Sequence, residues 1–442
     1  MRPLILASFL CTVMSGAAHA ASTDNLCEGL YSGKDRMGVP QVAKPPFMKY
    51  YREPAFGTKV IRITQARQDQ VIKPVYSTIQ AWNADESLLM LYRTDPNGGH
   101  MLYDGQTYEH VRDLDIQPAD LEEVHWSHTD PDAFFYVSQH YSELGSFKKY
   151  SVKTNKTTKI RDFSKICGVR AVPTGGGDIH MQSMDDDLFG FRCITNNDTW
   201  IMFSYRISTD EIVTAPIGIE TTQWEAWTAP IPGPSGKQFW YQGKVLDLDL
   251  KTVKLSHDMA KSYEHANIGK THDGHDAIFQ AVFDPSPRGC GGDKGDGVGH
   301  LVVHDMDTGE CRPVINEERG YPYTTSSTHV SARAHLKPGW IAMSSVGYHR
   351  DYKYFSNKKK PPVFFSEIYL ANTDPENEVV CRLAHHRSFG KEAVRGAYHS
   401  YFGEPHATIS PSGTRILFGS DWYDSGSVDS YVIELPSFEH KQ

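Results

Sequence analysis

The sequence predicts an all-β fold, a seven-bladed β-propeller. Three observations lead to this prediction. A short phrase, in which a polar or aromatic segment precedes a tight turn and an apolar strand, occurs seven times along the chain. The phrase returns at uneven intervals of 40 to 76 residues, and periods of about 40 to 50 residues built from short strands are typical of propellers and related arrays. A second pair of strand-like segments follows in each unit, and seven units of four strands can close into a ring.

The seven phrases have the same internal order. The polar segments lie at residues 80–82, 125–127, 178–180, 225–227, 265–267, 329–331 and 405–407. Turns rich in Asn, Asp, Gly, Pro and Ser follow them at 83–85, 129–131, 185–187, 233–235, 272–274, 337–339 and 410–413. Short aromatic and aliphatic runs come next and predict buried strands at 88–92, 133–137, 188–191, 238–241, 277–282, 340–344 and 416–419.

The remaining strands and the closure of the ring follow from the same repeat. Polar turns within strand-like composition mark the second pair of strands near 102–105, 150–154, 205–210, 245–251, 303–309, 368–374 and 431–435. An early apolar segment at 59–64 is available to complete the last blade. We therefore expect residues 21–442 to form a single domain.

The first twenty residues are typical of a secretory signal peptide. Arg2 supplies a positive charge, residues 4–14 are apolar, and Ala18-His19-Ala20 supplies a small-residue exit. No later stretch approaches the roughly 20 apolar residues that a membrane-spanning helix needs. The sequence therefore predicts a secreted or periplasmic protein without a membrane span, and we expect it to be a monomer.

Six cysteines remain after the predicted signal peptide. An even number in an exported chain favours disulfides over free thiols, although the sequence alone does not determine the pairing. Local spacing suggests Cys167 with Cys193 and Cys290 with Cys311. That choice leaves Cys27 for Cys381, a pair that would support closure of the ring.

The charge balance excludes one class of partner. The formal net charge is −9, whereas nucleic-acid-binding proteins present a broad basic face. An acidic polysaccharide is not excluded, because one pocket can be basic on an acidic protein. We therefore expect no nucleic-acid partner.

Polar side chains are predicted to gather at one rim of the ring. The first strand of each blade lines the central channel, and its start shares a rim with the end of its antiparallel neighbour. Histidines from the first strands are His125, His180, His265, His329 and His406. Further candidates at this rim are Trp82, Arg93, His140, Arg192, Trp227, Tyr241 and Tyr348, and Arg333 is a further candidate for binding the substrate. A funnel of this composition is suited to a carbohydrate.

Each of these residues also has a structural interpretation. An inner-strand histidine can bond the backbone of a neighbouring blade, Trp82 and Trp227 can pack between blades, and Arg93 and Arg192 can pair with acidic neighbours. Two functional uses of the histidines compete. His265, His329 and His406 can converge on one divalent metal ion from consecutive blades, or imidazoles can serve as acid and base near neutral pH.

The chain resembles the secreted β-propeller polysaccharide lyases, a group that includes oligogalacturonate lyases and propeller-type ulvan lyases. The resemblance covers the mature chain in architecture. It rests on the segment from Ala81 to Ser87, the segment from Thr328 to Arg333, and Glu404-Pro405-His406-Ala407 followed by Ser410-Pro411-Ser412-Gly413. Ser-Pro-Ser-Gly turns also occur in noncatalytic propellers of the TolB type.

This resemblance implies β-elimination at a uronic acid of an acidic polysaccharide, with sulfated, ulvan-like polymers among the candidates. Such a lyase neutralises the uronate, removes the proton at C5 and protonates the leaving oxygen. By blade position the resemblance implies that His125 and His140 act as base or acid, and that Arg192 neutralises the uronate with His180 beside it. Tyr241 is the best match for the usual tyrosine. For the oligogalacturonate lyases, which hold a divalent metal with late-blade histidines, His265, His329 and His406 suit that role.

Two other classes of function compete with a lyase. One is a noncatalytic propeller of the TolB type that binds a glycan or a protein. The other is a glycoside hydrolase on the same scaffold, with Glu225 and Asp421 as the working carboxylates. A lyase gives unsaturated products, a hydrolase gives saturated products, and a noncatalytic propeller gives no products.

Overall fold

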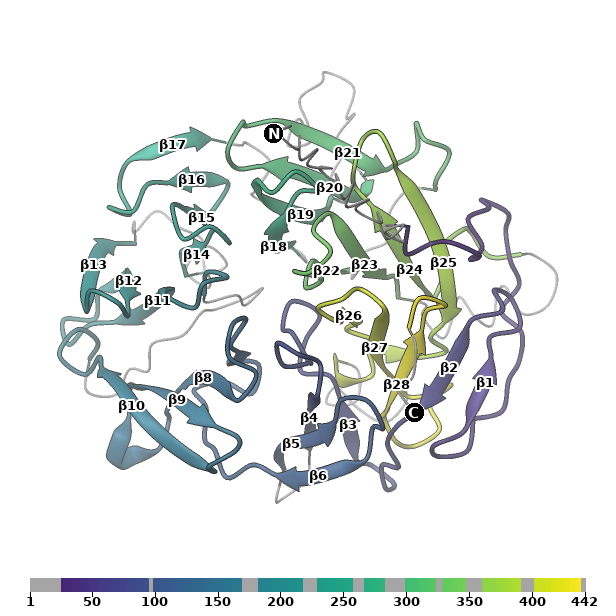
Figure 1. Ribbon diagram of the computed structural model, residues 1–442, viewed down its shortest axis with the longest axis horizontal. Helices are drawn as coiled ribbons and strands as arrows, with labels where there is room; N and C mark the ends of the chain where they lie inside the picture. The colour runs from purple at the N-terminus through teal and green to yellow at the C-terminus, as the bar shows by residue number, and fades with distance from the viewer. Residues whose placement is uncertain are drawn as a thin grey trace, which may run out of the picture.

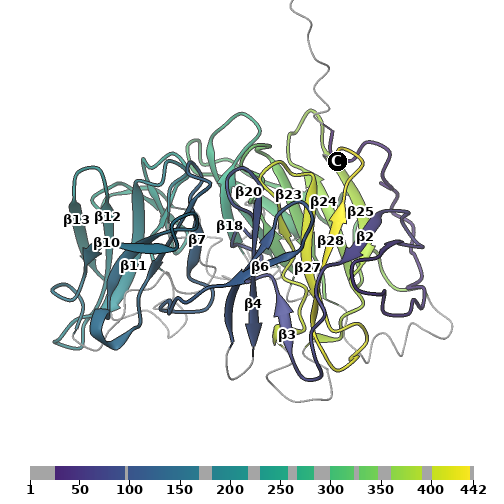
Figure 2. The same ribbon diagram turned by 60° about the horizontal axis from the view of Figure 1, so that its bottom comes forward.

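The computed structural model describes residues 25–94, 98–168, 182–217, 229–256, 266–282, 299–322, 328–346, 360–390 and 401–438. These residues form a seven-bladed β-propeller, as predicted. Figure 1 shows seven sheets around a common axis, and Figure 2 shows their strands running between the two faces of the disc.

Blades 1 to 3 follow the repeat in chain order. Blade 1 contains β3 (Val71–Lys73), β4 (Leu88–Thr94), β5 (Gly99–Asp104) and β6 (His110–Asp113). Blade 2 contains β7 (Val124–Trp126), β8 (Ala133–Val137), β9 (Ser146–Ser151) and β10 (Lys156–Asp162), with the 3-10 helix η1 (Tyr141–Glu143) between β8 and β9. The described strands of blade 3 are β11 (Leu188–Ile194), β12 (Trp200–Arg206) and β13 (Glu211–Pro216).

Blades 4 to 6 each have four antiparallel strands. Blade 4 contains β14 (Ile231–Pro232), β15 (Phe239–Tyr241), β16 (Lys244–Leu246) and β17 (Val253–Ser256). Blade 5 contains β18 (Ala266–Lys270), β19 (Asp276–Val282), β20 (Gly299–Asp305) and β21 (Cys311–Ile315). Blade 6 contains β22 (His329–Ser331), β23 (Trp340–Ser344), β24 (Glu367–Asn372) and β25 (Val379–His385).

Blade 7 joins the two ends of the chain. Its late strands are β26 (Thr408–Ile409), β27 (Arg415–Ser420) and β28 (Asp429–Glu434), and the early strand β2 (Lys59–Arg62) pairs antiparallel with β28. β1 (Tyr50–Arg52) adds a fifth strand at the outer edge. The predicted closing strand at 59–64 is confirmed, because β2 occupies this position.

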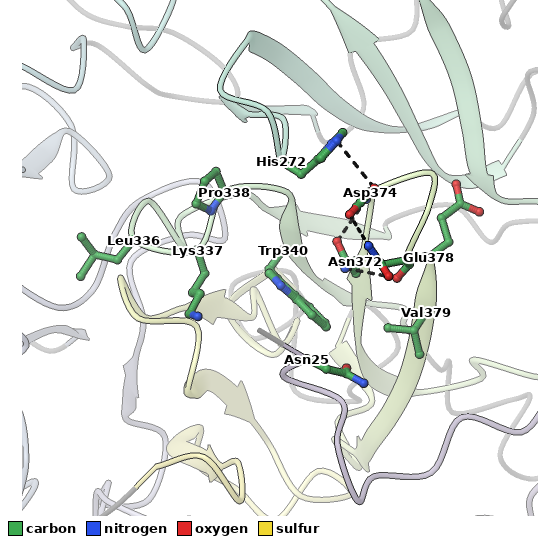
Figure 3. Close-up of a pocket in the computed structure, with 11 residues that line it drawn as sticks. Asn25, His272, Leu336, Lys337, Pro338, Trp340, Asn372, Asp374, Glu378 and Val379 are labelled. Atoms are coloured by element: carbon green, nitrogen blue, oxygen red, sulfur yellow. Dashed lines mark hydrogen bonds and ion pairs between the residues drawn. The ribbon is translucent and has the colours of Figure 1, made fainter. Parts of the chain in front are cut away.

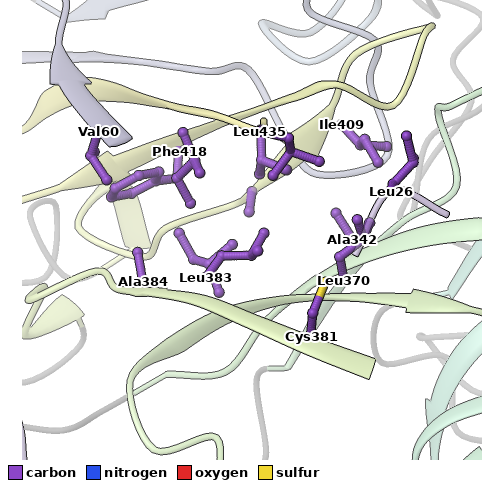
Figure 4. Close-up of a cluster of buried hydrophobic side chains, with 14 of the residues drawn as sticks. Leu26, Val60, Ala342, Leu370, Cys381, Leu383, Ala384, Ile409, Phe418 and Leu435 are labelled. Carbon is purple, nitrogen blue, oxygen red and sulfur yellow. The ribbon is translucent and has the colours of Figure 1, made fainter. Parts of the chain in front are cut away.

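A hydrophobic core and a disulfide fasten this closure. The cluster in Figure 4 contains Leu370 and Leu383 of blade 6, Phe418 of blade 7 and Leu26 of the N-terminal segment. Cys27 is bonded to Cys381, 354 residues later in the chain. Both termini of the domain are thus attached to the same pair of blades.

The other expected disulfides have different outcomes. Cys167 and Cys193 form a disulfide, which confirms that pair. Cys311 is disulfide-bonded, and its expected partner Cys290 lies outside the described residues. The predicted signal peptide also lies outside them. Within the described part of the chain, no helix has the length and apolarity to cross a membrane.

Carboxylates in the turns between first and second strands connect neighbouring blades. Asp186 of blade 3 accepts hydrogen bonds from Ser127 Oγ (2.6 Å), the His128 backbone N–H (3.0 Å) and Thr129 Oγ1 (2.7 Å) of blade 2. Burial opposes ionisation of this carboxyl, but hydrogen bonds and the charge of His128 outweigh it and lower the pKa of Asp186 to about 2. The carboxylate therefore stabilises the junction of the two blades.

Asp186→Asn is expected to destabilise the fold by about 2 kcal/mol at neutral pH. Because the folded pKa lies below the value for an unfolded chain, this stabilisation is present above about pH 4 and is lost as the pH falls toward 2. Urea unfolding at several pH values measures it. The exposed Asp115→Asn is the control, and an Asp186→Asn protein as stable as this control would contradict the prediction.

Candidate functional site

The inner strands place His329 and His406 at the same depth in the ring. Ser331 faces Ala342, two residues after the start of β23, and Thr408 faces Leu417, two residues after the start of β27. Each histidine lies two residues before its serine or threonine. The two imidazoles consequently meet near the axis, with ring centroids 4.4 Å apart.

Glu404 completes a buried donor cluster with these histidines. Its Oε2 atom lies 3.4 Å from His329 Nε2 and 3.6 Å from His406 Nε2. One donor atom from each of the three residues lies within 4.8 Å of the others, and all three side chains are buried. Two imidazoles and one carboxylate are a donor set that suits a divalent transition metal.

Sequence reasoning identified only part of this cluster. His329 and His406 were predicted as metal ligands, whereas the predicted third ligand, His265, lies outside the described residues. Glu404 was missed, although its position two residues before His406 was a usable signal. Pro405 between them disfavours a helical conformation at Glu404.

Blade 1 supports the cluster with a buried lysine. Lys73 Nζ contacts His406 Nδ1 and donates to the Glu404 carbonyl oxygen at 3.1 Å. Burial lowers the pKa of Lys73 to about 7, against the attraction of Glu404 and Glu122. The contact with Nδ1 fixes the orientation of the imidazole and leaves its Nε2 atom facing Glu404.

Aromatic residues and a second carboxylate surround this support. The Tyr76 ring lies 4.7 Å from the His406 ring, and the Tyr401 ring lies 4.9 Å from it. Tyr401 Oη donates to Glu122 Oε1 at 2.5 Å. Burial raises the pKa of Glu122 to about 7. Titratable groups with shifted pKa values that gather around one cluster are typical of a functional site.

A second group lies on blades 2 to 4. Burial lowers the pKa of Arg192, while the nearby Glu123 and Tyr241 oppose this shift. The guanidinium carbon lies 5.0 Å from the centroid of the Trp200 ring. Glu123 immediately precedes β7, at the depth that His329 and His406 occupy in their own blades. The structure thus brings Arg192 and Tyr241, two of the predicted residues, near one another.

His125 lies deeper in the channel than the metal-donor cluster. It faces Phe135, two residues after the start of β8, and so occupies the layer of Ser331 and Thr408. Two strand residues correspond to about 6.6 Å of depth. Burial, followed by the charges of Arg333 and His128, lowers the pKa of His125 to about 3.

Arg333 lines the same deep part of the channel. It borders a small cavity together with His125 and Gln80. Its Nε atom donates to Asn267 Oδ1 at 3.1 Å, and burial lowers its pKa to about 9. These contacts join blades 5 and 6 and place Arg333 beside His125.

Three other predicted residues lie away from the donor cluster. The Trp82 ring is completely buried, with the Arg415 guanidinium 5.0 Å from its centroid, so it packs between blades 1 and 7 and offers no face to a sugar. Arg93 donates to Asp113 on the outermost strand of blade 1 at 3.0 Å. His140 precedes η1, and its Nδ1 atom lies 2.8 Å from Ser142 Oγ. The predicted His180, Trp227 and Tyr348 lie outside the described residues.

The carboxylates of the hydrolase alternative are not a pair among the described residues. Asp421 accepts hydrogen bonds from the backbone of Phe389 (3.0 Å), Gly390 (3.1 Å) and Asp424 (3.0 Å). Burial raises the pKa of Asp421 to about 6. Glu225 lies outside the described residues. The contacts of Asp421 indicate that it shapes the loop after β25.

A further cavity of about 720 Å³ lies at the opposite ends of the strands (Figure 3). It is lined by His272, Lys337, Trp340, Asn372 and Asp374, among others. Its polar groups bond one another: Asn377 Nδ2 donates to Asp374 Oδ2 at 2.8 Å, and His272 Nε2 lies 3.6 Å from Asp374 Oδ1. The turns that border the cavity are therefore stabilised by contacts among their own polar side chains.

No protein-family model and no curated protein matches the chain. Among solved structures it is similar to an oligogalacturonate lyase in complex with manganese, with a TM-score of 0.58, 15% identity, and coverage of 89% of this chain and 97% of that chain. An oligogalacturonate lyase from Vibrio parahaemolyticus matches with a TM-score of 0.58, 16% identity, and coverage of 88% and 96%. At these identities the likeness shows a shared fold.

Proposed function

We propose that this protein is an exported, metal-dependent polysaccharide lyase that cleaves a uronate-containing polysaccharide by β-elimination. The observation that carries the proposal is the buried cluster of His329, Glu404 and His406, which lies beside the starts of the inner strands of blades 6 and 7. The propeller fold, which oligogalacturonate lyases share, supports it. Two disulfides agree with a secreted or periplasmic location.

The donor set fits a divalent metal ion such as manganese, and one solved structure with this fold is a manganese complex. When bound, such an ion supplies positive charge that stabilises the enolate-like charge of a uronate carboxylate. His329, Glu404 and His406 would hold it. Lys73 would keep the His406 ring in place through its contact with Nδ1.

We assign substrate binding to the group on blades 2 to 4 that contains Arg192 and Tyr241. Arg192 would bind the uronate carboxylate, because a guanidinium can donate two parallel hydrogen bonds to it. Tyr241, near Arg192, would transfer a proton at the reacting sugar. In the reaction the C5 proton leaves to a base, the C4–O bond breaks, a C4–C5 double bond forms, and the leaving oxygen gains a proton.

Purified protein should form unsaturated, ultraviolet-absorbing ends from at least one of four polymers: polygalacturonate, alginate, glucuronan or ulvan. Addition of EDTA should abolish the signal and Mn²⁺ should restore it, whereas Arg192→Ala should lower the rate at least ~100-fold. Asp115→Asn is the matched control. Saturated fragments would favour a hydrolase, and binding without products would favour a noncatalytic propeller; either result would overturn the proposal.

A further inference from the structure

The outer edge of blade 2 is basic, although the chain is acidic. Residues 143–165 contain seven basic and two acidic side chains, a net charge of +5, whereas the whole chain carries −9. The basic residues are Lys148, Lys149, Lys153, Lys156, Lys159, Arg161 and Lys165. We name this set the blade-2 edge. It lies on β9, on β10 and beside them, outside the axial channel (Figure 1).

The strand register brings like charges together on this edge. Lys159 of β10 lies directly opposite Lys148 of β9. Like charges at opposite positions of an antiparallel pair destabilise the sheet. Glu143 pairs with Lys148, and Asp162 lies 3.9 Å from Lys159, so each of these two lysines has one acidic neighbour. The edge as a whole keeps its net charge of +5, which an anionic partner would neutralise.

Several cations of the edge are available to such a partner. Lys153, Lys156 and Lys165 are exposed and form no ion pair with any carboxylate in the described ranges. Lys149 and Arg161 pair with Asp130 (2.9 Å) and Asp210 (2.7 Å), but each keeps about two-fifths of its side chain exposed. Cations at both ends of β10 thus remain accessible along about 20 Å of strand.

Protection of a sheet edge does not account for this number of charges. Lysines on an edge strand prevent pairing with another chain, and a single charge serves that purpose. The other outermost strands, β1, β6, β13, β17, β21 and β25, contain at most one Lys or Arg each. β10 contains Lys156, Lys159 and Arg161.

An exposed tyrosine, packed against a half-buried histidine, continues the edge toward the rim that holds the donor cluster. Tyr141 is 88% exposed, and its ring lies 4.8 Å from that of His140. The Lys148 hydrogen bond and charge lower the pKa of Glu143 in the same short helix, and the charges of His140 and Lys159 add to this. Aromatic faces beside cations suit sugar rings that carry carboxylates.

We propose that the blade-2 edge, together with Tyr141, binds an acidic polysaccharide outside the axial channel. The inferred ligand is a uronate or sulfate polymer that lies along β10. The claim that this polymer is also the substrate rests on the proposed function. The claim that the polymer binds to the blade-2 edge does not. The edge would hold the polymer near the channel mouth and raise its local concentration there.

Binding of polygalacturonate to the full-length protein, measured by titration calorimetry in EDTA at low salt, tests this inference. The triple variant Lys153→Gln/Lys156→Gln/Lys159→Gln should bind at least ~10-fold more weakly than wild type. The matched control, Lys237→Gln/Lys244→Gln/Lys251→Gln, removes three exposed charges from blade 4 and should bind as wild type does. Wild-type affinity should fall as salt rises, and uncharged dextran should not bind. Thermal unfolding verifies that both variants fold.

Two results would overturn the inference. One is wild-type affinity in the blade-2 triple variant, and the other is tighter binding to phosphatidylglycerol vesicles than to polygalacturonate. EDTA separates this test from the proposed function, because binding is measured without cleavage. Edge-dependent binding without unsaturated products would refute the lyase proposal alone, and products without edge-dependent binding would refute only the inference.

Discussion

Glu53→Gln should destabilise the protein by about 3–5 kcal/mol, because it leaves a buried guanidinium without its counter-charge. Glu53 is fully buried in the β1–β2 hairpin. It accepts hydrogen bonds from Arg387 NH1 (2.6 Å) and NH2 (3.0 Å), and its Oε1 atom lies 3.3 Å from His385 Nδ1. Burial alone would raise the pKa of Glu53, but His385 and Arg387 outweigh it and lower that pKa.

The network extends into blade 6, which explains the size of the effect. His385 Nε2 lies 3.7 Å from Glu367 Oε1, and Glu367 accepts two hydrogen bonds from Arg382, at 2.7 and 2.6 Å. Contacts among ionisable side chains therefore connect the N-terminal hairpin to β25. Loss of Glu53 disturbs both the pair and the closure of the ring.

Urea unfolding at pH 7 measures this effect, with the exposed Glu28→Gln as the control. The double variant Glu53→Leu/Arg387→Met should be less destabilised than Glu53→Gln, because it removes both charges. A loss below about 1 kcal/mol for Glu53→Gln would show that Arg387 finds another partner or water.

The ring and its closure were predictable because they depend on repeats. A strand period and turn residues recur in every blade, so that 59–64 could be assigned to the last blade before any contact was known. The Glu53–Arg387 pair could not be predicted. Its members are 334 residues apart, and neither belongs to a repeated phrase. Contacts made only by closing the ring leave no local pattern.

The candidate site was likewise predictable only where it depends on the repeat. Repetition identified His329 and His406, whose equivalent positions bring them together. His125 belongs to the same kind of phrase but sits two residues later in register, and a period of about 40 residues does not resolve such a shift. Lys73 has the sequence context of an ordinary strand residue, and only the ring brings it to His406.

Mn²⁺ is expected to raise the thermal unfolding temperature of the wild-type protein and to leave that of His329→Ala and Glu404→Ala unchanged. A ligand that binds only the folded state at 100 times its Kd adds about 2.7 kcal/mol of stability. Removal of one of three protein ligands should abolish this gain. Each variant is compared with its own metal-free protein, so that a loss of packing at the buried positions does not enter the comparison.

A second donor cluster in blade 5 provides a matched control for this experiment. His275, Asp305 and Asp307 also bring donor atoms within 4.8 Å of one another, but they are not buried. His275 Nδ1 already lies 2.7 Å from Asp305 Oδ2, and that hydrogen bond raises the pKa of His275. His275→Ala should therefore keep the full response to Mn²⁺. A response lost in His275→Ala and kept in His329→Ala would move the metal from the axial channel to the outside of blade 5, and the lyase proposal would then lose the observation that carries it.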